Sequence, residues 1–157
     1  MMKVMIDEEV EQISGPRKLL SGHFQTMAVQ AVAISPDNRF LAAASIDARV
    51  TLCDLEKGTL INAFSGALNS YNSVAVSRDG QRVFAGANPG GLSVWDTGSL
   101  QSVGTFKGPR ELIGGLAILS GSDTVVSVGS GALCLWRAPS WAEIEAEEKK
   151  LESKQSP

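Results

Sequence analysis

Few residues of this sequence could carry out catalysis or bind a metal ion. His23 is the only histidine, and Cys53 and Cys134 are the only cysteines. The chain has neither C-x-x-C spacing nor a second histidine, so neither a zinc site nor a cysteine–histidine nucleophile is indicated. The acidic run in residues 7–11 is typical of a solvated surface. We therefore predict no enzymatic activity, no metal site and no cofactor.

Two glycine-rich segments invite comparison with phosphate-binding loops. They are NPGGLSVW, residues 88–95, and SVGSGALCLW, residues 127–136. A phosphate cradle needs a helix that begins directly after the glycines, whereas both segments lead into strand-like runs. We interpret both as hairpin turns.

Length and composition favour one soluble domain. The chain has 157 residues, 43% of them hydrophobic, which is enough to build a core. Its net charge is −3 and its basic residues are scattered, so no nucleic-acid partner is predicted. The longest apolar run, residues 40–45, is far below the roughly 20 residues that cross a bilayer, so no membrane association is predicted.

The cysteines and the N-terminus indicate the cellular compartment. Both cysteines lie in apolar, strand-like runs, where free buried thiols fit a reducing environment; a disulfide between them is the alternative. The acidic N-terminus is a poor signal peptide. The expected location is the cytoplasm.

One sequence pattern recurs at a fixed spacing. Residues 32–54 align without a gap on residues 74–96, and a third copy covers residues 116–136. Trp136 of this copy follows Trp95 one position earlier than the offset of the first two copies requires, so the third copy is shorter in a turn. A period of about 40–45 residues is typical of the four-stranded blades of a propeller.

Each copy consists of short strands separated by turn residues. In the second copy, Asp-Gly at residues 79–80 and Pro-Gly at residues 89–90 supply the backbone angles that tight hairpins need. The runs between turns are short and lack the period of a helix. These features predict an all-β fold.

The repeats resemble those of the WD-repeat β-propeller family. The resemblance rests on Gly22-His23, on residues 35–58, on Trp95-Asp96 and on LCLWR at residues 133–137, and it covers about residues 17 to 137. It implies about three four-stranded blades of a bacterial-type multi-repeat WD protein, similar to that protein's C-terminal repeats. The blade-motif positions that it implies are His23, Ser45, Asp47, Asp54, Trp95, Asp96 and Trp136.

In that family, a buried polar network often joins a His, a Ser or Thr, an Asp and the Trp of one blade. His23, Ser45 and Asp47 match the first three positions in the first copy, but Cys53 stands where the Trp belongs. The second copy has Trp95 but neither the His nor the Asp. Because no copy has the full set, we expect this network to stabilise the blades less than usual.

The number of expected strands is too small for a closed ring. Residues 17–22 align with the ends of the first two copies as an additional outer strand, and the copies supply four, four and three more. Twelve strands make three blades, whereas typical propellers have four to eight. An open half-ring would expose apolar faces and unpaired strand edges.

We therefore predict a two-fold homodimer in which each N-terminal outer strand completes the last blade of its partner. The seam would include Leu19, Leu20, Leu133 and Leu135. Strand exchange of this kind gives six blades, and extra strands from residues 2–8 would give seven or eight. The alternative is a natural or engineered fragment of a longer propeller whose missing blades come from another chain.

The C-terminal tail changes abruptly from strand-like to helical sequence. Ser140 and Glu143 form a capping box at the start of residues 139–154, and Trp141 and Ile144 lie on one face. The predicted helix either docks on the last blade or binds a partner. The ending resembles those of bacterial multi-repeat WD proteins. The predicted divisions are residues 1–16 as an N-terminal segment, residues 17–137 as the repeats, and residues 138–157 as helix and tail.

The function expected for such a chain is binding rather than catalysis. Propellers bind partners through loops at their rim, and Tyr71, Asn72 and Arg110 are candidate contact residues there, with ordinary surface as the alternative for each. The first hypothesis is a non-catalytic protein–protein interaction scaffold that binds itself and an unknown protein. The second is a C-terminal fragment of a larger bacterial regulatory protein of the kinase-linked type. The third is an enzyme or ligand-binding propeller with its site in the channel.

Overall fold

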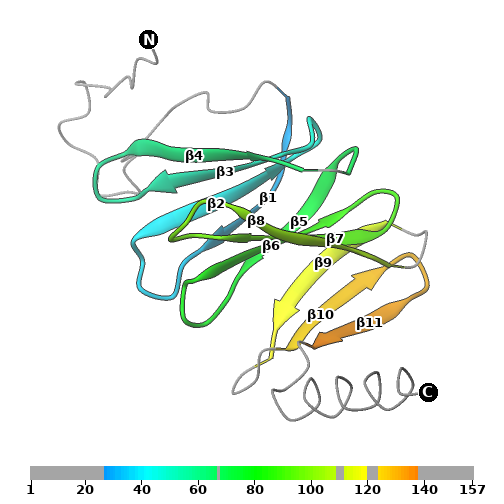
Figure 1. Ribbon diagram of the computed structural model, residues 1–157. Coiled ribbons are helices and arrows are strands. Elements are labelled where there is room, and N and C mark those ends of the chain that lie inside the picture. Colours follow the sequence, from blue (N-terminus) through cyan, green and yellow to red (C-terminus); the bar gives the residue numbers. More distant parts are fainter. Residues whose placement is uncertain (1–26, 67, 109–111, 120–123, 138–157) are drawn as a thin grey trace, which may run out of the picture.

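In the computed structural model, the described residues form eleven β-strands joined by turns and no helix (Figure 1). The structure describes residues 27–66, 68–108, 112–119 and 124–137. Several predictions lie outside these residues: the N-terminal segment 1–16, the outer strand 17–22 with Leu19 and Leu20, His23, Arg110 and the C-terminal helix. They stay predictions, as do the domain divisions.

The strands form three antiparallel sheets, each made of strands consecutive in sequence. We call these sheets blades 1, 2 and 3. Blade 1 contains β1 (Val29–Ile34), β2 (Phe40–Ser45), β3 (Arg49–Asp54) and β4 (Thr59–Ser65). Blade 2 contains β5 (Tyr71–Val76), β6 (Arg82–Ala87), β7 (Gly91–Asp96) and β8 (Ser102–Lys107). Blade 3 contains β9 (Ile113–Ile118), β10 (Thr124–Gly129) and β11 (Leu133–Arg137).

The sequence repeat coincides with the blades. Ala43 in β2 pairs with Val32 and Thr51, and its equivalent in the second copy, Ala85, pairs with Val74 and Ser93. The first hairpins match as well, since Asn38 (φ 58°) and Gly80 (φ 73°) occupy the same left-handed turn position. Asparagine and glycine are the residues that adopt this conformation most readily. The predicted all-β fold with strands grouped into blades is confirmed.

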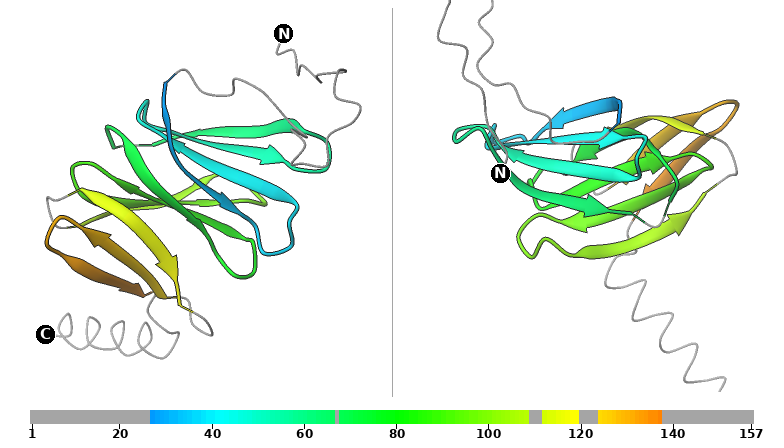
Figure 2. Two further views of the ribbon diagram at one scale, coloured as in Figure 1. Left: turned by 180° about the vertical axis from the view of Figure 1, so that it is seen from behind. Right: turned by 90° about the horizontal axis from the view of Figure 1, so that it is seen from above.

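The three blades stand one after another with their first strands as neighbours (Figure 2). β5 contacts β1 on one side and β9 on the other. The core lies between the blades, in one apolar cluster at the junction of blades 1 and 2 and a second at the junction of blades 2 and 3. Blade 2 is therefore covered on both faces.

The third sheet differs from the first two. Within the described residues it has three strands, with β11 at one edge, and no counterpart of β4 and β8. Among all the residues that the structure describes, no helix is long and apolar enough to cross a membrane.

Candidate interaction surface

Neither a metal-binding cluster nor a disulfide is found among the described residues. No group of three or more His, Cys, Asp or Glu side chains in this part of the chain could hold a metal ion. Cys53 and Cys134 are both free thiols, so the disulfide considered above does not form. Cys53 is buried, and desolvation raises the pKa of its thiol, which keeps it protonated and unreactive.

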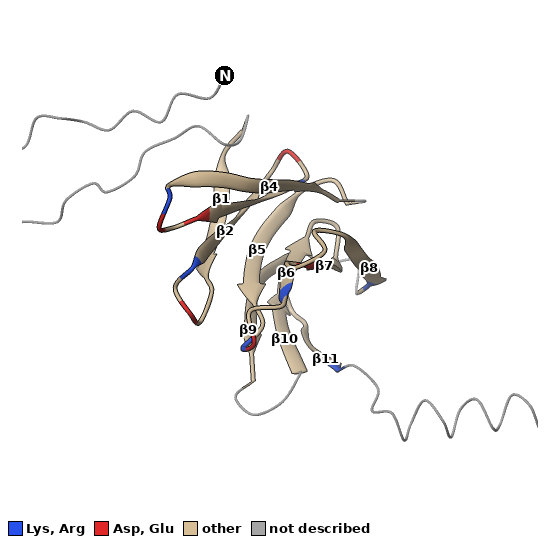
Figure 3. Ribbon diagram, turned by 60° about the vertical axis from the view of Figure 1, so that its left-hand side comes forward, with Lys and Arg blue, Asp and Glu red and all other residues tan. Residues whose placement is uncertain are grey.

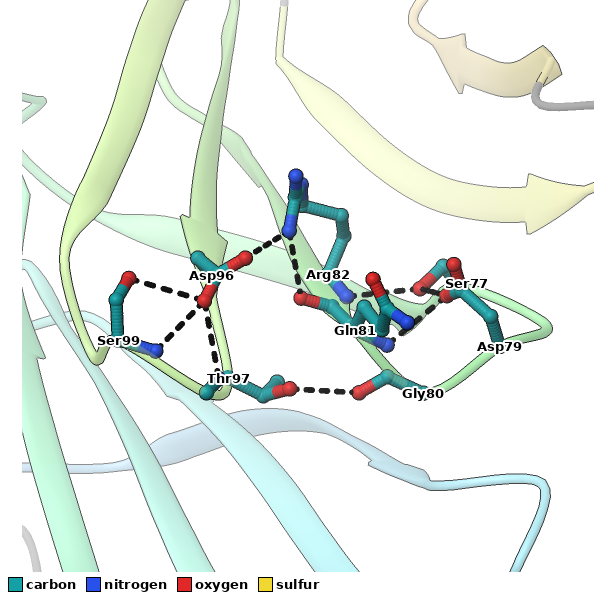
Figure 4. Close-up of polar contacts among 9 residues, drawn as sticks. Ser77, Asp79, Gly80, Gln81, Arg82, Asp96, Thr97 and Ser99 are labelled. Atoms are coloured by element: carbon teal, nitrogen blue, oxygen red, sulfur yellow. Dashed lines mark hydrogen bonds and ion pairs between the residues drawn. The ribbon is translucent and has the colours of Figure 1, made fainter.

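The acidic residues of the first hairpins hold turns. In the β5–β6 turn, the Ser77 hydroxyl donates to Asp79 Oδ1 at 2.5 Å, and the Arg82 N–H donates to Ser77 Oγ at 2.8 Å (Figure 4). Ser35 and Asp37 make the same contact in blade 1 at 2.6 Å. The serine hydroxyl bond and the backbone N–H bonds lower the pKa of both aspartates. These residues therefore fix hairpins and are not poised for acid–base chemistry.

Asp54 and Asp96 close the turns that lead to the outer strands. Asp96 Oδ1 accepts hydrogen bonds from the backbone N–H groups of Gly98 at 3.0 Å and Ser99 at 2.7 Å, and its other oxygen pairs with Arg82 (Figure 4). The hydrogen bonds from Ser99 are the main cause of its lowered pKa. Asp54 Oδ1 likewise accepts from two backbone N–H groups, at 3.0 and 2.8 Å. Both blade-motif aspartates thus serve structure.

The structure bonds the blade-motif residue Trp136 to a serine that was not among the predicted blade-motif positions. Trp136 Nε1 donates to Ser127 Oγ at 2.8 Å, and Ser127 occupies the register position of Ala43 and Ala85. Ser45, chosen from the sequence, lies two positions further along the strand and donates to the Ala28 carbonyl at 3.1 Å. Sequence reasoning missed Ser127. The available signal was that Ser127 is the only hydroxyl residue at that strand position in the three copies.

Asp47 lies in the turn between β2 and β3. Its backbone N–H donates to Ser45 Oγ at 3.5 Å, which ties the turn to the end of β2. The network that the resemblance implied would also need His23, which lies outside the described residues.

Aromatic residues dominate the junction between blades 1 and 2. Phe64 of β4 stacks on Trp95 of β7 with ring centroids 5.4 Å apart, and Tyr71 meets the same indole edge-on at 5.5 Å. The Tyr71 hydroxyl donates to Ser93 Oγ at 2.8 Å. A Cβ on Gly66 would collide with the Tyr71 ring, so the glycine makes room for it. This junction is a closely packed core.

The first strand of blade 1 exposes positions that are buried in blade 2. Val32 of β1 is 59% exposed, whereas its equivalent Val74 in β5 is 7% exposed. Val29 and Ile34 of β1 are also more than half exposed. We call these three residues the N-terminal face. In blade 2 the same positions pack against blade 1.

The last strand of blade 3 has the opposite side open. Leu133 is 62% exposed, whereas its equivalent Leu92 in β7 is 2% exposed. Leu135 is as exposed as Leu133, and its equivalent Val94 is buried. Together with the exposed Val128 of β10, these residues form what we call the C-terminal face. In blade 2 these positions pack against blade 3.

Neither open face carries a charge that would deter association. Every Lys, Arg, Asp and Glu of the described residues lies in a turn or at the end of a strand (Figure 3). Two uncharged apolar faces at the ends of a stack are typical of surfaces that bind protein.

The comparisons with known proteins agree with this geometry. Residues 14–54 match the family WD domain, G-beta repeat (WD40). The chain is 29% identical over 103 residues to an uncharacterized WD repeat-containing protein of Synechocystis sp., and 25% identical over 116 residues to autophagy-related protein 16 of Arabidopsis thaliana. It superposes on the crystal structure of the RRP9 WD40 repeats with a TM-score of 0.69 at 20% identity, over 74% of this chain.

The chain is thus similar to WD-repeat proteins. It spans only part of what it resembles: 29% of the Synechocystis protein, 23% of the Arabidopsis protein and 37% of the RRP9 chain. The superposition establishes the propeller-blade fold of the chain.

The predicted rim is wrong at Tyr71, which is fully buried. It begins β5, where blade 1 has Val29, and its ring turns inward onto Trp95 instead of toward solvent. Asn72 is half-buried, and its Oδ1 accepts a hydrogen bond from Ser70 Oγ at 3.4 Å. The surface that stands out is instead the pair of open faces, which includes the predicted seam residues Leu133 and Leu135.

Proposed function

We propose that this WD-repeat chain is a non-catalytic scaffold for protein–protein interaction, and that a second copy supplies the blades that complete its ring. The observation that carries the proposal is the contrast between Leu92 and Leu133. Equivalent residues are buried where a following blade is present and exposed where none follows among the described residues. The C-terminal face is thus a blade surface without its neighbour.

Ring closure also follows from blade number. Typical propellers close with four to eight blades, and two copies of three blades supply six. Two-fold symmetry is the commonest closed arrangement of identical chains. In the proposed strand exchange, residues 17–22 of each copy would pair with β11 of the other, because β11 is an edge strand in the described part of blade 3.

The binding role is supported by what the polar residues do. Asp37, Asp79, Asp54 and Asp96 are all engaged in turns, and the buried Cys53 thiol is protonated. WD40 repeat domains typically mediate protein–protein interactions. We place the protein in a bacterial cytoplasm, with an unidentified protein as its further partner and with neither nucleic acid nor membrane.

A second candidate is a C-terminal part of a larger bacterial regulatory WD-repeat protein. The chain spans 29% of the Synechocystis relative, so the missing blades could belong to the same polypeptide. Blades preceding blade 1 would then cover Val32 and Ile34 of the N-terminal face, and the kinase-linked hypothesis would apply.

Size-exclusion chromatography with light scattering separates the two candidates. The homodimer predicts twice the chain mass of 16.5 kDa. A species of single-chain mass or a heterogeneous aggregate would contradict the homodimer and favour the second candidate. Variants that place charges on the open faces are described below, and the matched control for them is the double variant Ile61→Glu/Val103→Glu. These two equivalent outer-strand positions are exposed in both blades 1 and 2, so this control should remain a dimer.

A further inference from the structure

We infer that two copies associate head to tail, with the C-terminal face of each packed on the N-terminal face of the other in the register of the internal blade junctions. This inference rests on the proposed homodimer and specifies which surfaces meet. Its basis is the two internal junctions, between blades 1 and 2 and between blades 2 and 3, which have the same arrangement.

Both internal junctions join the same two sets of positions. At the junction of blades 1 and 2, Val50 and Leu52 of β3 share an apolar cluster with Val74 and Val76 of β5. At the next junction, Leu92 and Val94 of β7 take the place of the β3 pair.

Their neighbours at that junction are Leu116 and Ile118 of β9, which take the place of the β5 pair. In each case, residues of the third strand of one blade and of the first strand of the next blade belong to the same apolar cluster.

At the two ends of the stack, the residues equivalent to these junction residues are exposed. Leu133 and Leu135 of β11 are the third-strand pair of blade 3, and Val32 and Ile34 of β1 are the first-strand pair of blade 1. All four are more than half exposed. Each pair thus lacks the apolar cluster to which its equivalents belong, and a second copy of the chain offers the residues that would complete it.

The two faces also match in the kind of residue that they carry. At the junction of blades 1 and 2, Phe64 from a fourth strand stacks on Trp95. The described part of blade 3 has no fourth strand to provide the phenylalanine, and Cys53 stands in blade 1 where Trp95 stands in blade 2. The described C-terminal face therefore lacks the phenylalanine of the aromatic pair, and the N-terminal face lacks the tryptophan. A junction between these two faces would be aliphatic.

Symmetry favours head-to-tail contact over pairing of like faces. If two N-terminal faces met, both C-terminal faces would stay exposed, and the blades could not continue around a ring. A head-to-tail contact repeated by a two-fold axis along the channel covers all four faces with one type of junction. The same contact without closure would instead produce a filament.

Complementary variants test this arrangement. Leu133→Glu/Leu135→Glu places charges on the C-terminal face, and Val32→Glu/Ile34→Glu does so on the N-terminal face. Each variant alone loses the dimer, because every junction in the ring needs both faces. All four side chains are exposed in the single chain, so circular dichroism should show an unchanged fold.

Mixing the two variants restores one intact junction. By light scattering, we expect a 1:1 complex of twice the chain mass in the mixture, and the single-chain mass of 16.5 kDa for each variant alone. If wild type is a dimer but either variant alone stays dimeric, the head-to-tail arrangement is wrong while the dimer stands. If wild type itself is a monomer, the proposed function fails as well.

Crosslinking provides a second measurement that does not depend on the strength of one junction. In a Cys134→Ser background, one set of copies carries Val32→Cys and a second, differently tagged set carries Leu135→Cys. A short thiol crosslinker should join the two sets to each other. Products that join two Val32→Cys copies, or two Leu135→Cys copies, would overturn the arrangement, as would the absence of mixed product in a dimeric sample.

Discussion

Blade 2 and the two blades beside it have the same sequence pattern but different surroundings. Leu92 and Leu133 are the same residue at the same strand position, yet Leu92 is buried and Leu133 is mostly exposed. The difference comes from the presence or absence of a neighbouring blade rather than from anything local. In a repeat fold, each unit buries its apolar face only against the next unit.

The polar interior of blade 2 differs in a similar way from that of blade 1. Tyr71, Ser93 and Thr105 form a hydrogen-bonded chain in blade 2, with distances of 2.8 and 3.1 Å. The equivalents in blade 1 are Val29, Thr51 and Ala63, and the buried Thr51 hydroxyl has no hydrogen-bond partner within the described residues. Blade 2 is therefore the better-satisfied unit, and substitutions there should cost more.

The largest difference is expected between the two tryptophans. Trp95→Ala removes a buried indole that contacts both Phe64 and Tyr71, and should lower the free energy of unfolding by about 3–5 kcal/mol. Trp136→Ala at the equivalent, half-buried position should cost clearly less. Urea denaturation of both variants measures this, and equal losses would contradict the comparison.

A methyl group at Gly66 should have the next largest effect. Its ideal Cβ would lie 1.6 Å from the Tyr71 hydroxyl oxygen, and the ring cannot move freely because it is fully buried. We expect Gly66→Ala to lower the free energy of unfolding by roughly 1–3 kcal/mol. The matched control is Gly114→Ala in β9, where the added Cβ meets nothing within 4 Å. A loss at Gly114 as large as that at Gly66 would show that steric conflict is not the cause.

A smaller difference should separate two hydroxyl deletions. Tyr71→Phe breaks the bond to Ser93 and should cost about 1 kcal/mol of unfolding free energy. Thr51→Val removes a hydroxyl that has no hydrogen-bond partner among the described residues, so it should be neutral or slightly stabilising. Thermal and urea denaturation of both variants check this. A Thr51→Val variant less stable than Tyr71→Phe would reverse our assignment of the better-satisfied blade.

The smallest expected effect is a dependence of the free energy of unfolding on pH in the acidic range. The pKa of Asp79 in the folded chain lies below its ordinary value of 3.8, mainly because the Ser77 hydroxyl donates to it. Its contribution to stability is therefore complete above that ordinary value, and it is lost as the pH falls through the lower folded-state pKa.

Urea denaturation at a series of pH values measures this contribution. As the pH falls below the ordinary pKa of 3.8, the Asp79→Asn variant should lose less stability than wild type. Glu56→Gln, an exposed turn residue, is the control and should follow wild type. A loss for Asp79→Asn as steep as that for wild type would contradict the role of this carboxylate.

The fold was predictable because the repeat itself carries the information. The constant spacing between the first two copies places Asn38 and Gly80 at equivalent positions of their turns. It also aligns Ala43 with Ala85, so the blade boundaries follow from the sequence. Turn residues act locally, and their effect does not depend on the neighbouring blade.

The direction of individual side chains was less predictable. Tyr71 reads as a loop aromatic, and only the packing of Phe64 and Gly66 from the preceding blade reveals that it is buried. The bond from Trp136 to Ser127 likewise depends on the register of two strands. Contacts of this kind are set by tertiary packing, which a single sequence does not display. The exposure of Leu133 and Leu135, by contrast, was suggested by counting strands.

The dependence of the melting temperature on protein concentration tests the central claim most directly. Unfolding of a dimer into separate chains is opposed by mass action, so the melting temperature of wild type should rise by several degrees over a hundredfold increase in concentration. The Leu133→Glu/Leu135→Glu variant should show no such rise. A wild-type melting temperature that stays constant over the same range would contradict the claim that a second copy covers the open faces.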